Sequence, residues 1–242
     1  NEKFNILEHL ESLDKKESAI ISNESIKETK DFVPAFSLGD RTRSFLKVQD
    51  GCDYFCTFCT IPLARGKSRN ASIQDTVNQA SKIAETDVKE VVLTGVNIGD
   101  FGQGGQEDFF GLVKELDEVT GIDRFRISSI EPNLLSDEII SYCLSDAARF
   151  VPHFHIPLQS GSNKLLKAMR RKYERELFAD RVNQIKTIRP DACIGVDVIV
   201  GFPGETDADF METVDFLKEL EISYLHILVV HQRHRLRQMH FF

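Results

Sequence analysis

Short apolar segments alternate with longer amphipathic segments from residue 45 to residue 230. Six of the short segments are rich in β-branched and aromatic residues and lie between polar turns, as strands do. Near-continuous apolar character, clearest in ACIGVDVIVG, is typical of strands buried on both faces of a parallel sheet. The predicted strands are residues 45–49, 90–96, 124–130, 153–158, 192–201 and 222–230.

The segments between these strands predict crossover helices. Ser72 with Asp75, and Thr206 with Asp209, have the spacing of helix-starting capping boxes. Repeated right-handed βα units close into a barrel or part of one, so we expect functional residues after the strands, at one end of the fold. The predicted helices are residues 73–85, 108–119, 135–145, 162–169, 174–188 and 206–220.

Composition limits the class of protein. The chain has 242 residues, 41% hydrophobic and 28% charged, which suits one large α/β domain. No apolar run approaches the roughly 18 residues of a membrane span, so no membrane is predicted. The net charge of -8 argues against general polyanion binding, and any nucleic acid would need a local basic patch. Five cysteines, three of them clustered, favour a reducing cytoplasm over a disulfide framework.

The segment GCDYFCTFC directly follows the first predicted strand and carries Cys52, Cys56 and Cys59. Thiolates at this spacing favour zinc or an iron-sulfur cluster. A structural zinc ion normally takes four protein ligands, so it would need a further residue such as His153 or His155. A cluster held by three cysteines leaves one iron open for a substrate or cofactor. We favour the cluster, and a zinc-stabilised binding module is the alternative.

Several segments resemble the methylthiotransferase branch of the radical S-adenosylmethionine (SAM) enzymes. They are FLKVQDGCDYFCTFCTIPLARGKSRN, LTGVNIGDFG, RISSIEP, HFHIPLQSGSNKLLKAMRRKY and GVDVIVGFPGET. Asp53-Tyr54 and residues 64–69 and 153–155 are most similar to the subfamily that acts on threonylcarbamoyladenosine in tRNA. The resemblance implies an α/β fold, a partial (β/α)6 radical-SAM barrel with parallel strands, with the cysteine loop after its first strand.

The resemblance also implies roles for individual residues. Cys52, Cys56 and Cys59 would ligate a 4Fe-4S cluster whose open iron binds S-adenosylmethionine, and Phe58 would pack against the adenine of that cofactor. The reaction would begin at C2 of a modified adenosine beside the anticodon and add a methylthio group there. The further cofactor contacts that it implies are Thr94, Gly95, Asn97, Ser129, Glu131, Gln159 and Ser160.

The partners expected from this resemblance are a tRNA substrate and a reductant such as flavodoxin or ferredoxin. Arg65, Lys67 and Arg69 form a basic patch beside the cysteine loop, where an RNA phosphate or the carboxylate of the cofactor could bind. Residues 170–172 form a second basic run. Such runs usually form a solvated face, which is the prediction here, although the position of both runs near strand ends favours a functional role modestly. The alternative substrates are isopentenyladenosine in tRNA and a ribosomal protein.

The expected domain organisation has three parts. Residues 1–42 resemble the end of the family's N-terminal domain followed by a linker, and they contain no cysteine for the auxiliary cluster of that domain. Residues 43–230 form the radical SAM core. Residues 231–242, HQRHRLRQMHFF, depart from the family pattern and are predicted to be an atypical tail.

Overall fold

Six parallel strands form the framework of the fold. The computed structural model describes residues 6–9, 18, 21, 25–26, 29–37 and 42–230. Parallel pairing joins the first three of the six strands into one sheet and the last three into another. The six strands are β2 (Arg43–Lys47), β5 (Glu90–Thr94), β6 (Arg124–Ile127), β7 (His153–Gln159), β8 (Cys193–Val200) and β9 (Tyr224–Val229).

The two sheets meet between β6 and β7, where isolated parallel bridges join Phe125 to Phe150 and Ser129 to His155. Within the described residues no pairing joins β9 to β2, so the sheet is an open, partial barrel. The predicted order of six parallel strands in an α/β fold is therefore confirmed.

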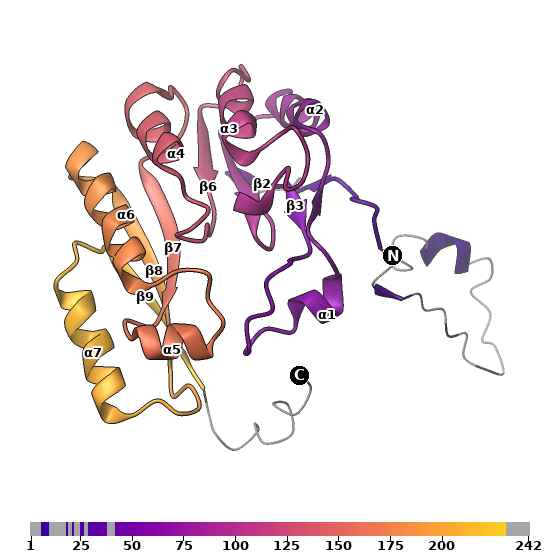
Figure 1. Cartoon of the computed structure of the whole chain (residues 1–242). Coiled ribbons are helices and arrows are strands. Elements are labelled where there is room, and N and C mark those ends of the chain that lie inside the picture. Colours follow the sequence, from indigo (N-terminus) through magenta and orange to yellow (C-terminus); the bar gives the residue numbers. More distant parts are fainter. Residues whose placement is uncertain are drawn as a thin grey trace.

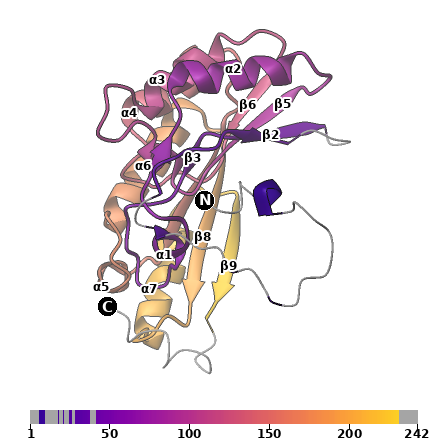
Figure 2. The ribbon, with the colours of Figure 1, turned by 90° about the vertical axis from the view of Figure 1, so that its right-hand side faces the viewer.

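The described part of the chain contains seven α-helices, and those that connect parallel strands pack on the outer face of the curved sheet (Figure 1). Figure 2 shows α2, α3, α4 and α6 on one side of the strands, with the arrowheads of β8 and β9 pointing toward α1 and α5. The helices are α1 (Ile61–Arg65), α2 (Ile73–Ala84), α3 (Phe109–Asp117), α4 (Asp137–Ser141), α5 (Asn163–Ala168), α6 (Arg175–Ile188) and α7 (Asp207–Lys218).

One large apolar core lies between the strands and these helices. Because side chains alternate across a strand, β7 sends Phe154 and Ile156 into that core and turns His153 and His155 to the inner face of the barrel. The apolar positions thus build the helix-covered side, and the polar positions line the inner side. This division leaves the inner face available for chemistry.

Local structure departs from the sequence prediction in a few places. The predicted helix 135–145 is α4 followed by one π-helical turn, Tyr142–Asp146. The short elements α1, β1 (Ala35–Phe36), β3 (Gln49–Asp50) and β4 (Arg69–Asn70) were not predicted, because segments of two to five residues carry no clear periodicity. Of the two predicted capping boxes, the one at Thr206 and Asp209 has both bonds: the side chain of each residue accepts from the backbone amide of the other.

The predicted tail, residues 231–242, and much of residues 1–42 lie outside the described residues. Within the described part of the chain, no helix is long and apolar enough to cross a membrane.

Candidate radical SAM site

The cysteine loop is attached to its surroundings through backbone groups. The Cys52 amide donates to Gly66 O at 3.0 Å, and the Thr57 amide donates to Met169 O at 3.2 Å, at the end of α5. Gly51, which precedes the loop, has a φ of +72°, and a Cβ there would lie 1.9 Å from Lys67 O. Glycine is therefore required at the turn that directs the loop across the strand ends.

The three cysteines of the loop are free thiols, and the surroundings of Cys52 and Cys56 disfavour ionisation of those two. Burial, together with the charges of Asp100 and the two other cysteines, raises the pKa of Cys52 to about 11. Burial also raises the pKa of Cys56, although Arg171 works in the opposite direction. Because thiolates are the ligand form, binding of a positively charged metal centre must supply the energy that ionises them.

The three sulfurs of the loop are not gathered as ligands of one ion in this structure. Among the described residues, the sulfurs of Cys52, Cys56 and Cys59 do not all lie within 4.8 Å of one another. One zinc ion, with Zn–S bonds of about 2.3 Å, would hold its sulfurs less than about 4 Å apart. A 4Fe-4S cluster places each thiolate on a different iron, so it does not require the three sulfurs to approach one another this closely.

A buried ion pair lies directly behind the cysteine loop. Arg171 forms a short ion pair with Glu131, and its Nη1 donates to Cys56 Sγ at 3.3 Å. Only 4% of the Arg171 side chain is exposed, and its Nε donates to the Tyr173 hydroxyl at 3.1 Å. Burial raises the pKa of Glu131, and Arg171 offsets part of that effect.

The basic run at residues 170–172 was predicted to be a solvated face, and for Arg171 that prediction is wrong. The chain turns back after α5, where Arg170 has a φ of +59°. This turn directs Arg171 into the fold toward Glu131. Arg170 and Lys172 are exposed, as predicted.

The loop after β5 is organised by Gln49. Its Oε1 accepts from the amides of Val96 and Asn97, both at 2.9 Å, and a Cβ on Gly95 would lie 3.0 Å from that same oxygen. Asn97 Nδ2 in turn donates to Asp100 at 2.7 Å. Asn97 Oδ1 is buried without a hydrogen-bond partner, so this loop presents a free acceptor at the carboxyl end of β5.

Asp100 is a buried carboxylate that makes no ion pair within the described part of the chain. Burial raises its pKa to about 6, and the neighbouring Asp53 adds to the effect. The folded protein therefore binds more protons than the unfolded chain between about pH 4 and pH 6, and the free energy of unfolding falls as the pH rises through that range.

Asp100→Asn is therefore expected to stabilise the cofactor-free protein above pH 6, by about 2 to 3 kcal/mol at neutral pH and by much less near pH 4. Urea unfolding of both proteins at several pH values measures the difference. Asp87→Asn, at an exposed position after α2, is the control and should change stability little. A stability gain that is the same at acidic and neutral pH would contradict the charge explanation.

The structure places the other predicted cofactor contacts at the same end of the strands, with different local roles. Gln159 is buried at the end of β7 with a φ of +67°, and its Oε1 has no partner. The hydroxyls of Thr94 and Ser160 bond within the fold, to Leu46 O at 3.1 Å and to Thr213 at 3.2 Å. Phe58 is 38% exposed on the loop.

The predicted RNA-binding patch is partly occupied by a buried carboxylate. Asp50, only 2% exposed, pairs with Arg65 at 3.0 Å, with Arg69 at 3.3 Å and with Lys47 at 2.8 Å. Burial would raise the pKa of Asp50, but these cations lower it to about 2. Lys67 is exposed, and half of the Arg65 side chain is also accessible.

Comparison with known proteins identifies the family. A model of the radical SAM superfamily matches residues 46–217. The solved radical SAM methyltransferase TsrM from Kitasatospora setae, with cobalamin and a 4Fe-4S cluster bound, shares the fold with a TM-score of 0.64. It is 16% identical, and the match covers 76% of this chain and 36% of TsrM. The chain belongs to the radical SAM superfamily, which confirms the predicted family, fold and cofactor class.

Two curated relatives with higher sequence identity are named as enzymes that act on tRNA. The threonylcarbamoyladenosine tRNA methylthiotransferase MtaB of Bacillus subtilis is 48% identical over 203 residues, which cover 83% of this chain and 44% of that protein. The tRNA-2-methylthio-N(6)-dimethylallyladenosine synthase of Rickettsia rickettsii is 34% identical over 223 residues, which cover 90% of this chain and 50% of that protein. The chain thus spans half the length of these relatives or less.

Proposed function

We propose that this chain is the radical SAM core of a tRNA methylthiotransferase that modifies C2 of N6-threonylcarbamoyladenosine next to the anticodon. The observation that carries the proposal is the three-cysteine loop at the carboxyl ends of the parallel strands, which backbone hydrogen bonds hold in place. The choice of substrate rests on the higher identity to the threonylcarbamoyladenosine enzyme than to the dimethylallyladenosine enzyme.

Cys52, Cys56 and Cys59 would hold the 4Fe-4S cluster, and the strand ends would hold S-adenosylmethionine. When bound, this pair supplies a carbon radical that can remove a hydrogen atom from an unactivated position. The buried, unpartnered oxygens of Asn97 and Gln159 fit a ligand with N–H and O–H donors, because an orphaned acceptor in a dry site is costly until a donor arrives.

The carboxylates near the loop suit a cationic cofactor. Burial is the main cause that raises the pKa values of Cys52 and Cys56; the charge of Asp100 adds to it at Cys52, whereas Arg171 opposes it at Cys56. Asp100, which has no ion pair among the described residues, therefore leaves a negative charge near Cys52. The cofactor carries an ammonium and a sulfonium group, and its binding would compensate that charge. The Arg171–Glu131 pair keeps the second carboxylate fixed behind Cys56.

The remaining proposed contacts involve macromolecular partners. Lys67 and the accessible part of Arg65 would meet an RNA phosphate beside the loop. A reductant such as flavodoxin or ferredoxin would deliver the electron. The proposed location is the cytoplasm, in keeping with tRNA as the substrate and with five unpaired cysteines.

Mass spectrometry of tRNA nucleosides from cells lacking the full-length gene tests the substrate. The expected result is loss of the 2-methylthio form of threonylcarbamoyladenosine, with its unmodified precursor retained and the dimethylallyladenosine derivatives unchanged. Complementation with the wild-type gene should restore the methylthio group, and a gene carrying Cys59→Ala should not. If the threonylcarbamoyladenosine derivative persists, and a dimethylallyladenosine derivative or a ribosomal protein loses its methylthio group, the proposed substrate is wrong.

A further inference from the structure

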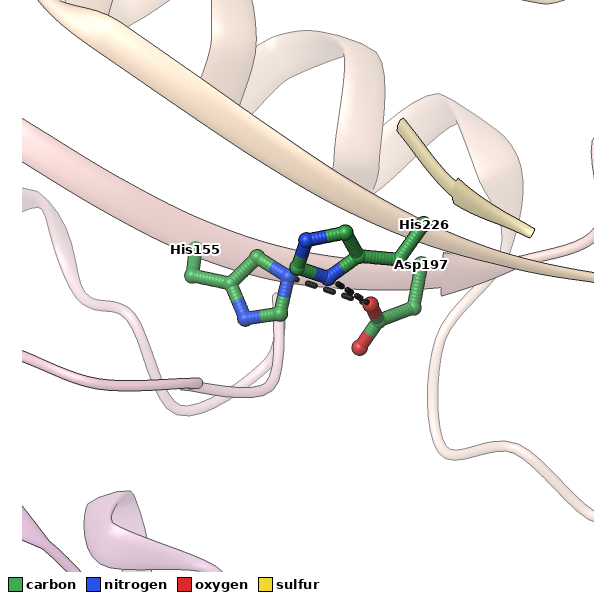
Figure 3. A group of neighbouring side chains, drawn as sticks. All are labelled: His155, Asp197 and His226. Carbon is green, nitrogen blue, oxygen red and sulfur yellow. Dashed lines mark hydrogen bonds and ion pairs between the residues drawn. The ribbon is translucent and has the colours of Figure 1, made fainter. Parts of the chain in front are cut away.

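A second group of potential ligand side chains lies on the inner face of the barrel, apart from the cysteines. His155 on β7, Asp197 on β8 and His226 on β9 come from three adjacent strands, and Figure 3 shows the three side chains converging. Asp197 lies directly opposite His226 in the parallel register of β8 and β9. The arrangement is therefore set by strand pairing and not by a loop.

The distances within this group match those between ligands of one metal ion. His155 Nε2 lies 3.1 Å from Asp197 Oδ1, and His226 Nδ1 lies 3.2 Å from the same oxygen. All three donor atoms lie within 4.8 Å of one another. Two ligands on a tetrahedral ion with bonds of about 2.0 Å lie about 3.3 Å apart. Small movements of His226, which is 61% exposed, would complete the geometry.

The orientation of His155 favours an ion over a simple hydrogen bond. Its Nε2 is buried and makes no hydrogen bond, although Asp197 Oδ1 lies 3.1 Å away, because the oxygen lies off the direction in which the ring nitrogen points. When two side chains bind the same ion, the lone pair of each donor atom points at the ion and not at the other donor atom. The two donor atoms then lie close together without a hydrogen bond between them.

The outer contacts of His155 are those of a metal-bound imidazole. Its second nitrogen, Nδ1, bonds to Ser129 Oγ at 2.5 Å, which fixes the ring and can leave Nε2 unprotonated. The ring also stacks on Tyr224, with centroids 6.1 Å apart and planes at 8°. Tyr224 in turn lies over Gly195, where a Cβ would lie 2.2 Å from the tyrosine ring. His155 is therefore held before any ligand binds.

We propose that His155, Asp197 and His226 form a binding site for a divalent transition-metal ion such as zinc or ferrous iron. Two imidazoles and one carboxylate suit such borderline ions, and three protein ligands leave positions open for an oxygen ligand. Ser129, which bonds to His155, lies two residues before Glu131, and Glu131 pairs with Arg171, which contacts Cys56. These contacts link the site to the cysteine loop. The site does not depend on the tRNA reaction proposed above.

Cobalt titration of the full 242-residue chain tests the site directly. Replacing Cys52, Cys56 and Cys59 together by serine removes the clustered thiolates, so a Co²⁺ spectrum that lacks a thiolate band then reports nitrogen and oxygen ligands. We expect one equivalent of Co²⁺ to bind with visible d–d absorption and no thiolate charge-transfer band, and Zn²⁺ to displace it.

Single substitutions in that background assign the ligands. His226→Gln should weaken Co²⁺ binding by more than ~10-fold without unfolding the protein, because His226 is largely exposed. Ser129→Ala, which removes an outer contact only, should weaken binding by about 10-fold. Asp215→Asn is the control, because Asp215 is an exposed carboxylate on α7 and is outside the group, so binding should be unchanged.

Two results would overturn the proposal. One is the absence of Co²⁺ binding in a protein that retains its cooperative thermal transition. The other is binding that persists unchanged in both His226→Gln and Asp197→Asn, which would place the ion on other histidines of the chain. Since neither S-adenosylmethionine nor RNA is present in the titration, these results are independent of the proposed enzymatic function.

Discussion

The Cys56→Ala variant is expected to form no detectable 5′-deoxyadenosine from S-adenosylmethionine, while keeping a cooperative thermal transition. The loop is anchored by the backbone bonds of Cys52 and Thr57, and the Cys56 thiol adds only its contact with Arg171. Loss of one of three ligands removes the cluster, whereas the fold loses about 1 kcal/mol. Chromatography of the reduced, anaerobic reaction mixture measures the product.

Cys143→Ala is the matched control for this experiment. Cys143 is 4% exposed in the core near α4 and does not belong to the cysteine loop. Its replacement should cost about 1 kcal/mol of stability by leaving a small cavity, with cofactor cleavage retained. Equal cleavage by the Cys56→Ala protein and the wild type would refute the assignment of Cys56 as a ligand.

Replacing Arg171 by methionine is expected to destabilise the protein by about 3 to 5 kcal/mol, the largest stability effect that we predict. The substitution keeps the length of the side chain but leaves Glu131 in the interior without its cationic partner. It also removes the bond from the Arg171 Nε to Tyr173, a residue that is 6% exposed. Urea unfolding at neutral pH measures the loss.

Two further variants separate the ion pair from general effects at this site. Arg170→Ala, at the exposed neighbouring position with the same residue type, should change stability by less than about 0.5 kcal/mol. Adding Glu131→Gln to Arg171→Met should recover part of the loss, because the buried charge is then removed along with its partner. A double variant as unstable as the sum of the two single variants would show that the pair does not act as a unit.

The strand order and the position of the cysteine loop could be predicted because each depends on local sequence. Strands such as β8 are near-continuous apolar runs, and polar or glycine-containing segments follow each of them. Parallel pairing then brings the ends of the strands to one edge without further information. The six strands and the family of the protein follow from these features.

The tertiary roles of several polar residues could not be predicted, because their partners are distant in the sequence. Gln49 holds the backbone of residues 96 and 97, and Arg171 pairs with Glu131 across 40 residues. A polar residue that ends a strand or belongs to a basic run has the same local pattern whether it is solvated or buried. A strong apolar periodicity therefore located the core, and only the packed fold showed which charges lie inside it.

The group formed by His155, Asp197 and His226 could also be predicted from the sequence only in part. HFHIPL and GVDVIVG indicate two strands, and the alternation within each places His155 and Asp197 on one face. Their approach, however, depends on the register of β7 with β8, in which Asp197 lies opposite Pro157 and His155 lies opposite Gly195. The absent side chain of Gly195 makes room for Tyr224, and with it for the stacked ring of His155.

Iron and sulfide analysis after anaerobic reconstitution tests the central claim most directly. The wild-type chain should gain a brown colour, about four iron and four sulfide per polypeptide, and a reduced electron paramagnetic resonance signal that changes when S-adenosylmethionine is added. A wild-type protein that folds yet remains colourless and free of iron, or that takes up a single zinc ion on its cysteines instead, would contradict the assignment of this loop to a radical SAM cluster.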